Sequence, residues 1–223
     1  MSQRQRAFIR HWTRVGSPPL VPEVRLHLGR ELMPLWQALA RDAADPELPP
    51  PYWAFAWAGG QALARYVLDH PDEVRGARVL DFATGSGLCA IVALQAGAAD
   101  VYGTDIDPWS APAVALNATL NGLHVPFVGG DPLDDQPPDA DVILAGDIGY
   151  EWNLATRGAA WLRRAVDRGA RVLIGDPERH YLPPDGLAVA ATYDVPTTLD
   201  LEQTLVKHTT VFRVEPGARP DVS

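Results

Sequence analysis

The chain has 223 residues, 47% of them hydrophobic, which is enough for one domain with a sizeable core. Its formal net charge of −9 gives no general electrostatic basis for binding nucleic acid or an anionic membrane. The single cysteine, Cys89, excludes an internal disulfide and a cysteine metal cluster, and no stretch approaches the ~20 apolar residues of a membrane span.

Residues 1–51 are expected to form a helical extension that packs on the main domain. Residues 4–15 place apolar side chains along one helical stripe. Apolar positions between Pro22 and Arg41 predict one or two further helices, and Pro34 is expected to end or kink the first of them. The proline-rich segment that follows is expected to be extended.

Residues 52–61 crowd four aromatic side chains before a glycine pair and precede a predicted helix that ends near Leu68. One interpretation is a hydrophobic plug under a sheet. The other is a lid over a ligand, with Trp57 and the backbone of Gly59 in contact with it. Aromatic faces stabilise cations by roughly 0.5–2 kcal/mol, so this lid would suit a positively charged ligand.

Residues 77–81 form an apolar run that ends in an acid, which predicts a strand buried on both faces. Gly85 and Gly87 allow a sharp turn and a close approach of a ligand to the backbone. Ser86 is expected to cap a helix over residues 88–96, whose free N–H groups would point at the ligand.

The next predicted strand ends at Asp105, an acid placed to accept hydrogen bonds from both hydroxyls of a ribose. The segment from Gly85 to Ala90 formally fits the dinucleotide fingerprint, so a dehydrogenase stays open, but the phosphate-clamping lysine of a Walker motif is absent because Lys207 is the sole lysine. Asp81 would repel a pyrophosphate. It would attract the α-ammonium and sulfonium groups of S-adenosylmethionine (SAM).

The D-x-x-x-G-x-G pattern of residues 81–87 resembles the SAM-binding motif of class I (seven-strand) methyltransferases, with Ala83 in place of the usual first glycine. The resemblance implies SAM as cofactor. It also implies an α/β fold over residues 52–214, a Rossmann-like, doubly wound, mostly parallel seven-strand sheet. Trp57 and Gly59 would then meet the methionine end of SAM.

Later elements complete the predicted sheet, and the last two strands are expected to be antiparallel. Asp131 stands where class I methyltransferases often contact the adenine amino group, although a turn residue is an equal alternative. His27 and His208 have no partners at metal-ligand spacing, so no metal site is predicted. The tail, 215–223, is expected to be disordered. Helices are predicted over 108–121 and 153–167, and strands over 125–128, 140–146, 171–174, 187–195 and 206–214.

Three segments, 20–28, 51–63 and 146–151, together resemble the lysine methyltransferases of the electron transfer flavoprotein β-subunit. The resemblance implies a SAM-dependent enzyme that transfers a methyl group in line to a deprotonated lysine amine of that partner protein. Its D-x-x-Y element falls on Asp147 and Tyr150, at the carboxyl end of the central strand. Asp147 would orient the amine or accept its proton, because a lysine amine with a pKa of ~10.4 must first lose one. The alternative role for Asp147 is the N-cap of the next helix.

Other functions stay open beside this one. A different acceptor, such as a ribosomal protein or a small nitrogen heterocycle, fits the same fold. A binding module that lost its chemistry is a further alternative, for which Ala83 and Ala58 are the hints. Arginine strongly outnumbers lysine. This usage is interpreted as a codon effect and predicts a bacterial, cytoplasmic protein.

Overall fold

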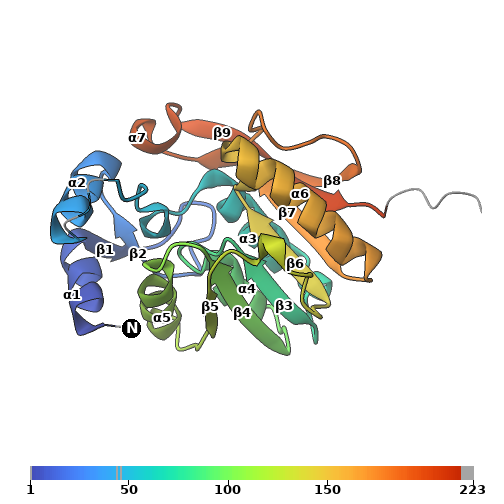
Figure 1. The fold of residues 1–223 in the computed structure, drawn as a ribbon, viewed down its shortest axis with the longest axis horizontal. Coiled ribbons are helices and arrows are strands. Elements are labelled where there is room, and N and C mark those ends of the chain that lie inside the picture. The colour runs from blue at the N-terminus through green and yellow to red at the C-terminus, as the bar shows by residue number, and fades with distance from the viewer. Residues whose placement is uncertain (1, 44, 46, 217–223) are drawn as a thin grey trace, which may run out of the picture.

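The computed structural model describes residues 2–43, 45 and 47–216, which fold around a seven-stranded sheet (Figure 1). Its strands are β3 (Arg78–Phe82), β4 (Asp100–Asp105), β5 (Phe127–Gly129), β6 (Val142–Gly146), β7 (Arg171–Asp176), β8 (Leu187–Pro196) and β9 (Val206–Val214). They are ordered β5-β4-β3-β6-β7-β9-β8. Neighbours from β5 to β7 are parallel, whereas β9 pairs antiparallel with β7 and β8. This topology confirms the predicted fold class.

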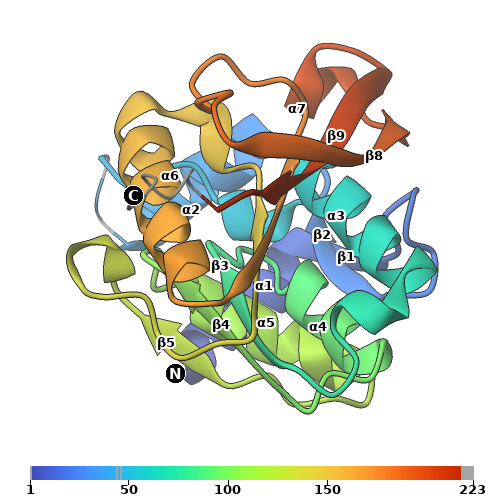
Figure 2. The same ribbon diagram turned by 90° about the vertical axis from the view of Figure 1, so that its right-hand side faces the viewer.

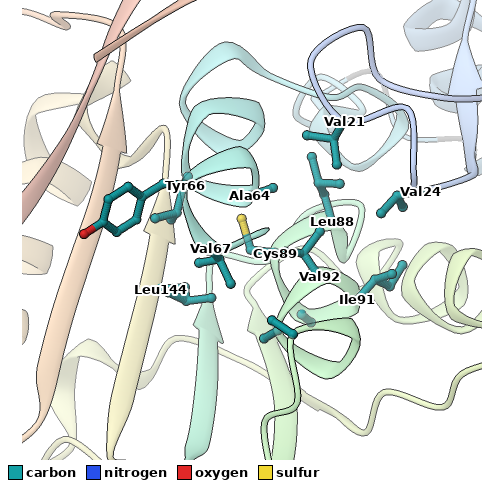
Figure 3. Packing of buried hydrophobic residues seen from close by; sticks show 14 of the residues in the cluster. Val21, Val24, Ala64, Tyr66, Val67, Leu88, Cys89, Ile91, Val92 and Leu144 are labelled. Atoms are coloured by element: carbon teal, nitrogen blue, oxygen red, sulfur yellow. The ribbon is translucent and has the colours of Figure 1, made fainter. Parts of the chain in front are cut away.

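Helices cover both faces of the sheet (Figure 2). They are α3 (Ala58–Asp69), α4 (Leu88–Gln95), α5 (Ser110–Leu120) and α6 (Trp152–Asp167). The short α7 (Leu199–Glu202) lies in the connection between β8 and β9. Side chains alternate along the central strands. Leu144 packs with Val67 and Cys89 on the α3 and α4 side (Figure 3), while its neighbour Ile143 packs with Trp161 of α6. Because both faces are covered, the central strands are mainly apolar, and the buried Asp81 in β3 is an exception.

The N-terminal extension differs from the expectation. It consists of α1 (Gln3–Trp12), β1 (Thr13–Gly16), β2 (Leu26–Gly29) and α2 (Leu32–Ala43). The prediction of a helix from Pro22 onward is therefore wrong for the residues that form β2. This strand pairs antiparallel with β1. It is fixed on α5, where the His27 N–H donates to Asn117 Oδ1 at 2.7 Å. Pro34 lies in the first turn of α2, where its missing N–H costs no helical hydrogen bond, so it does not end the helix.

The cap of α4 also differs from the expectation. The N-cap residue is Gly87, with a left-handed φ of 83°, and not Ser86. Asp81 of β3 supplies the missing cap, because its Oδ2 accepts the Ala90 N–H at 2.9 Å. Asp81, near the end of β3, therefore also holds the beginning of the next helix.

The remaining expected elements are present with shifted ends. The tail expected to be disordered, 215–223, lies outside the described residues from position 217 onward. Within the described ranges, no helix is long and apolar enough to cross a membrane.

The glycine pair of α3 lets this helix approach the sheet closely. A Cβ atom at Gly59 would lie 2.2 Å from the Gly175 carbonyl oxygen and 2.7 Å from Asp147 Oδ2, whereas a Cβ at Gly60 would meet nothing closer than 3.9 Å. We expect Gly59→Ala to lower the free energy of unfolding by about 3 kcal/mol or more, because backbone must move. Gly60→Ala, the matched control, should be neutral or stabilise by up to about 1 kcal/mol. Equal urea midpoints for both variants would contradict this packing.

Candidate active site

A cavity of about 440 Å³ opens at the carboxyl ends of β3, β4 and β6, the edge where ligands bind in open α/β sheets. Most of the residues proposed from the sequence line it, namely Trp57, Gly85, Asp105, Asp131, Asp147 and Tyr150. Three others, Gly59, Asp81 and Gly87, do not appear in its wall. They shape the backbone around it, at the α3 contact with β7 and at the start of α4.

The bend after β3 is fixed by the acid that ends β4. Asp105 Oδ2 accepts the Gly85 N–H at 2.8 Å, and its Oδ1 accepts the Asp107 N–H at 2.9 Å. Burial raises the pKa of Asp105, and these backbone donors counteract the rise. The Asp105 carboxylate also lines the cavity, where it can accept a hydroxyl. The predicted ribose contact is thus compatible with the geometry.

Asp81 is almost completely buried, with 2% of its surface exposed. Its Oδ2 accepts the Thr84 hydroxyl at 2.5 Å as well as the Ala90 N–H. Burial raises the pKa of Asp81 to about 7, although both donors act against the rise. Asp81 therefore supports the bend from below, and its predicted attraction for the α-ammonium group of SAM stays a prediction.

The buried Asp81 makes stability depend on pH. The folded protein holds this proton more tightly than the unfolded chain, where the pKa is 3.8, so its contribution to the free energy of unfolding falls as pH rises from about 4 to about 7. Relative to wild type, Asp81→Asn should gain about 3 kcal/mol between pH 5 and pH 8, at ~1.4 kcal/mol per pKa unit. Urea unfolding of both proteins without cofactor measures the difference. If the free energies of unfolding of the two proteins changed in parallel with pH, a raised pKa of Asp81 would be excluded.

The Asp131 carboxylate binds two neighbours, one through each oxygen. Its Oδ1 accepts the Leu133 N–H at 3.0 Å, which fixes a turn, and its Oδ2 pairs with Arg157 of α6 at 2.9 Å. It is therefore a turn residue and also part of the cavity wall. Because Leu133 and Ile106 line the same cavity, apolar surface lies beside these acids.

On the opposite side of the cavity, Asp147 has a left-handed φ of 55° and a side chain that is 12% exposed. Its Oδ2 accepts the Gly60 N–H at 2.7 Å, so it holds the N-terminus of α3 and not that of α6. The N-cap of α6 is Glu151, which accepts the N–H groups of Asn153 and Leu154. The alternative role considered for Asp147 thus belongs to another residue.

The side chains of the aromatic segment are divided between the core and the cavity wall. Trp53 is in the core, stacked on Trp109 with ring centroids 5.9 Å apart. Tyr52 and Trp57 line the cavity, and Tyr52 lies 5.6 Å from Trp57 and 5.2 Å from Tyr150 between ring centroids. Burial raises the pKa of Tyr150 to about 12, so it is a neutral ring near pH 7. These three rings line the same cavity as Asp147.

Several residues of the cavity wall were not predicted from the sequence, among them Tyr52 and Arg179. Tyr52 stood among the crowded aromatics, but nothing in the pattern distinguished it from core residues such as Trp53. Arg179 follows the carboxyl end of β7 by three residues, and its place at a strand end was the available signal. Among the described residues, no group of three or more His, Cys, Asp or Glu side chains could hold a metal ion.

Solved structures of similar fold include methyltransferases. The ribosomal protein L11 methylase of Lactobacillus delbrueckii subsp. bulgaricus superposes with a TM-score of 0.53 at 21% identity, over 70% of this chain and 77% of that one. The magnesium protoporphyrin IX methyltransferase of Synechocystis, solved with bound SAM, gives 0.51 at 21% identity, over 71% and 80%. At these identities the likeness shows the fold alone, which is that of class I SAM-dependent methyltransferases.

Sequence relatives narrow the class. A model of the ribosomal protein L11 methyltransferase (PrmA) family matches residues 61–148. The electron transfer flavoprotein beta subunit lysine methyltransferase of Xenopus laevis is 41% identical over 179 residues, 78% of this chain and 70% of the relative. That of Rattus norvegicus is 40% identical over 182 residues, 79% and 69%. The chain belongs to the family of electron transfer flavoprotein beta subunit lysine methyltransferases, which confirms the resemblance seen in the sequence.

Proposed function

We propose that this enzyme methylates the ε-amine of a lysine in the β-subunit of electron transfer flavoprotein. The observation that carries the proposal is the 41% identity to a methyltransferase of that name over 78% of the chain. The cavity supports it, because a buried carboxylate beside aromatic rings suits a long aliphatic side chain with a basic end.

SAM supplies an electrophilic methyl group on a sulfonium. In the transfer, the amine nitrogen forms a bond to this carbon while the carbon–sulfur bond breaks, and the nitrogen loses one proton. Asp147 would orient the amine and accept this proton, since the lysine must be neutral before it attacks. Tyr150, Tyr52 and Trp57 would align the amine and exclude water from it.

On the cofactor side, Asp105 would accept both ribose hydroxyls, and Asp131 would accept the adenine amino group. The bend at Gly85 would lie against the methionine part, with Trp57 over the sulfonium. Asp81 and Gly87 would hold this bend, and Gly59 would hold the α3 N-terminus beside it. The hydrogen bonds from Gly85 to Asp105 and from Ala90 to Asp81 support these assignments.

The test is direct methylation of the purified β-subunit with SAM, followed by mass spectrometry of its lysines. Wild-type enzyme should add one or more methyl groups to a defined lysine, and Asp147→Ala should add none. An unmodified β-subunit under conditions where the enzyme methylates other material would overturn the choice of acceptor.

A second acceptor has an observation of its own. The ribosomal protein L11 methyltransferase of Geobacter sulfurreducens is 35% identical over 156 residues, which cover 68% of this chain and 48% of that relative. Labelled SAM and a cell lysate would separate the two, because label on a ribosomal protein would favour this alternative. We prefer the flavoprotein because its methyltransferases match at higher identity over more of the chain. The bacterial, cytoplasmic origin inferred from arginine usage stays a prediction.

A further inference from the structure

A chain of two buried ion pairs links Asp147, in the cavity wall, to Glu202 of α7 through Arg179. Arg179 Nη2 lies 3.3 Å from Asp147 Oδ1 and 2.8 Å from Glu202 Oε1 of α7. The side chains of Arg179 and Glu202 are 22% and 3% exposed. Such a chain differs from a surface ion pair, because removal of one partner leaves an uncompensated charge in a poorly solvated place.

The backbone is arranged to bring these groups together. Asp176, at the end of β7, accepts the Arg179 N–H through Oδ1 at 2.6 Å. On the other side, the Leu32 N–H of α2 donates to Asp200 of α7 at 2.8 Å, so the helix that carries Glu202 is anchored too. The Arg179 side chain therefore links three connecting segments, namely those that follow β6, β7 and β8.

Backbone strain gathers at the same place. Among the described residues, the non-glycine positions with left-handed φ are Ala83, Asp147, Glu178 and Gln203. Asp147 is a member of the chain, Glu178 precedes Arg179 and Gln203 follows Glu202. Strained backbone is costly, and it persists at sites where the surroundings impose a required geometry. Its position here indicates that the alignment of these three side chains is itself required.

We propose that Arg179 is a positioning residue for methyl transfer, which fixes the free oxygen of Asp147 and keeps this carboxylate ionised opposite the acceptor amine. The proposal rests on the role assigned to Asp147 in the proposed function. Asp147 has its other oxygen on the Gly60 N–H, so the guanidinium completes its set of partners.

The charges around Asp147 act in opposite directions. Burial raises its pKa, the Arg179 guanidinium is the strongest influence that lowers it, and Glu202 raises it. Two further groups face it, Asp176 from β7 and the Cys89 thiol from α4. Removing Arg179 should therefore move the acid limb of the pH–rate profile to higher pH. Removing the charge of Glu202 should move it to lower pH.

The experiment compares kcat/KM of Arg179→Gln with that of wild type between pH 6 and pH 9, with SAM affinity measured by calorimetry. We expect a loss of about tenfold or more at pH 7, which shrinks as pH rises because the carboxylate regains its charge, with SAM affinity unchanged. Arg179→Lys should recover part of the activity, since an ammonium replaces the charge without the fork of the guanidinium. Glu202→Gln should displace the acid limb in the opposite direction.

A loss that is constant across pH, or a shift of the same sign in Arg179→Gln and Glu202→Gln, would overturn the proposal. If Arg179→Gln does not fold, Glu202→Gln decides, because its acid limb should move to lower pH. Asp147→Asn measured in parallel separates the two levels of inference. Full turnover in Asp147→Asn would overturn the role of Asp147 itself. A loss in Asp147→Asn, combined with a ratio of kcat/KM between Arg179→Gln and wild type that does not change with pH, would overturn the role of Arg179 alone.

Discussion

Asp105→Ala is expected to abolish measurable SAM binding. Each oxygen of this carboxylate is held by a backbone N–H, from Gly85 and from Asp107, and the proposed cofactor contact adds one ribose hydroxyl to each. A hydrogen bond to a charged group contributes about 1.5–3 kcal/mol, so the loss of two predicts at least ~100-fold weaker binding. The substitution also releases Gly85, and the bend would no longer be fixed. Isothermal titration calorimetry measures the effect.

Asp100→Ala is the matched control, because it removes an exposed acid from the opposite end of the same strand. It should bind SAM with wild-type affinity. Asp105→Asn should bind with intermediate affinity, since one oxygen acceptor remains. Wild-type affinity in Asp105→Ala would refute the assignment of the cofactor site.

Asp147→Ala is expected to keep SAM binding and to lose methyl transfer. Asp147 directly follows β6, whereas Asp105, the acid proposed for the ribose, ends β4. A positioned general base typically contributes about 10²–10⁴-fold, so turnover should fall by ~100-fold or more. Single-turnover methylation with saturating SAM is the measurement.

Two further variants guard this result against trivial explanations. Asp147→Asn keeps an oxygen for the Gly60 N–H and should lose turnover while it melts close to wild type. Asp141→Ala, at the amino end of β6 and paired with Arg78 outside the cavity, should retain full turnover. Full activity in Asp147→Asn would show that the charge is not needed.

The sheet could be predicted from the sequence because its strands are short apolar runs that end in acids or glycines, as residues 77–81 and 140–146 do. Local pattern also located Asp105 and Asp147, since strand ends converge at one edge. The β2 strand escaped prediction because the side chain that fixes it on α5, Asn117, is remote in sequence. Leu26 and Leu28 fit a helix about as well as they fit a strand.

The site was harder to predict than the fold, for the same physical reason. Packing between segments far apart in the chain buries Asp81 under the bend. The same kind of packing brings Arg179 to both Asp147 and Glu202. Residue type and spacing contain no such distances. The role of Glu151 as the cap of α6 was, by contrast, a local signal, since it precedes that helix directly.

The burial of Cys89 makes this chain convenient for labelling. The thiol lies in the core between α3 and α4, 5% exposed, and burial keeps its pKa well above the usual value. Thiol reagents react with the thiolate, so the native cysteine should stay silent toward maleimide dyes in the folded protein. A new cysteine on α7 or beside the cavity mouth would then take up a fluorophore alone and report the arrival of each ligand in real time.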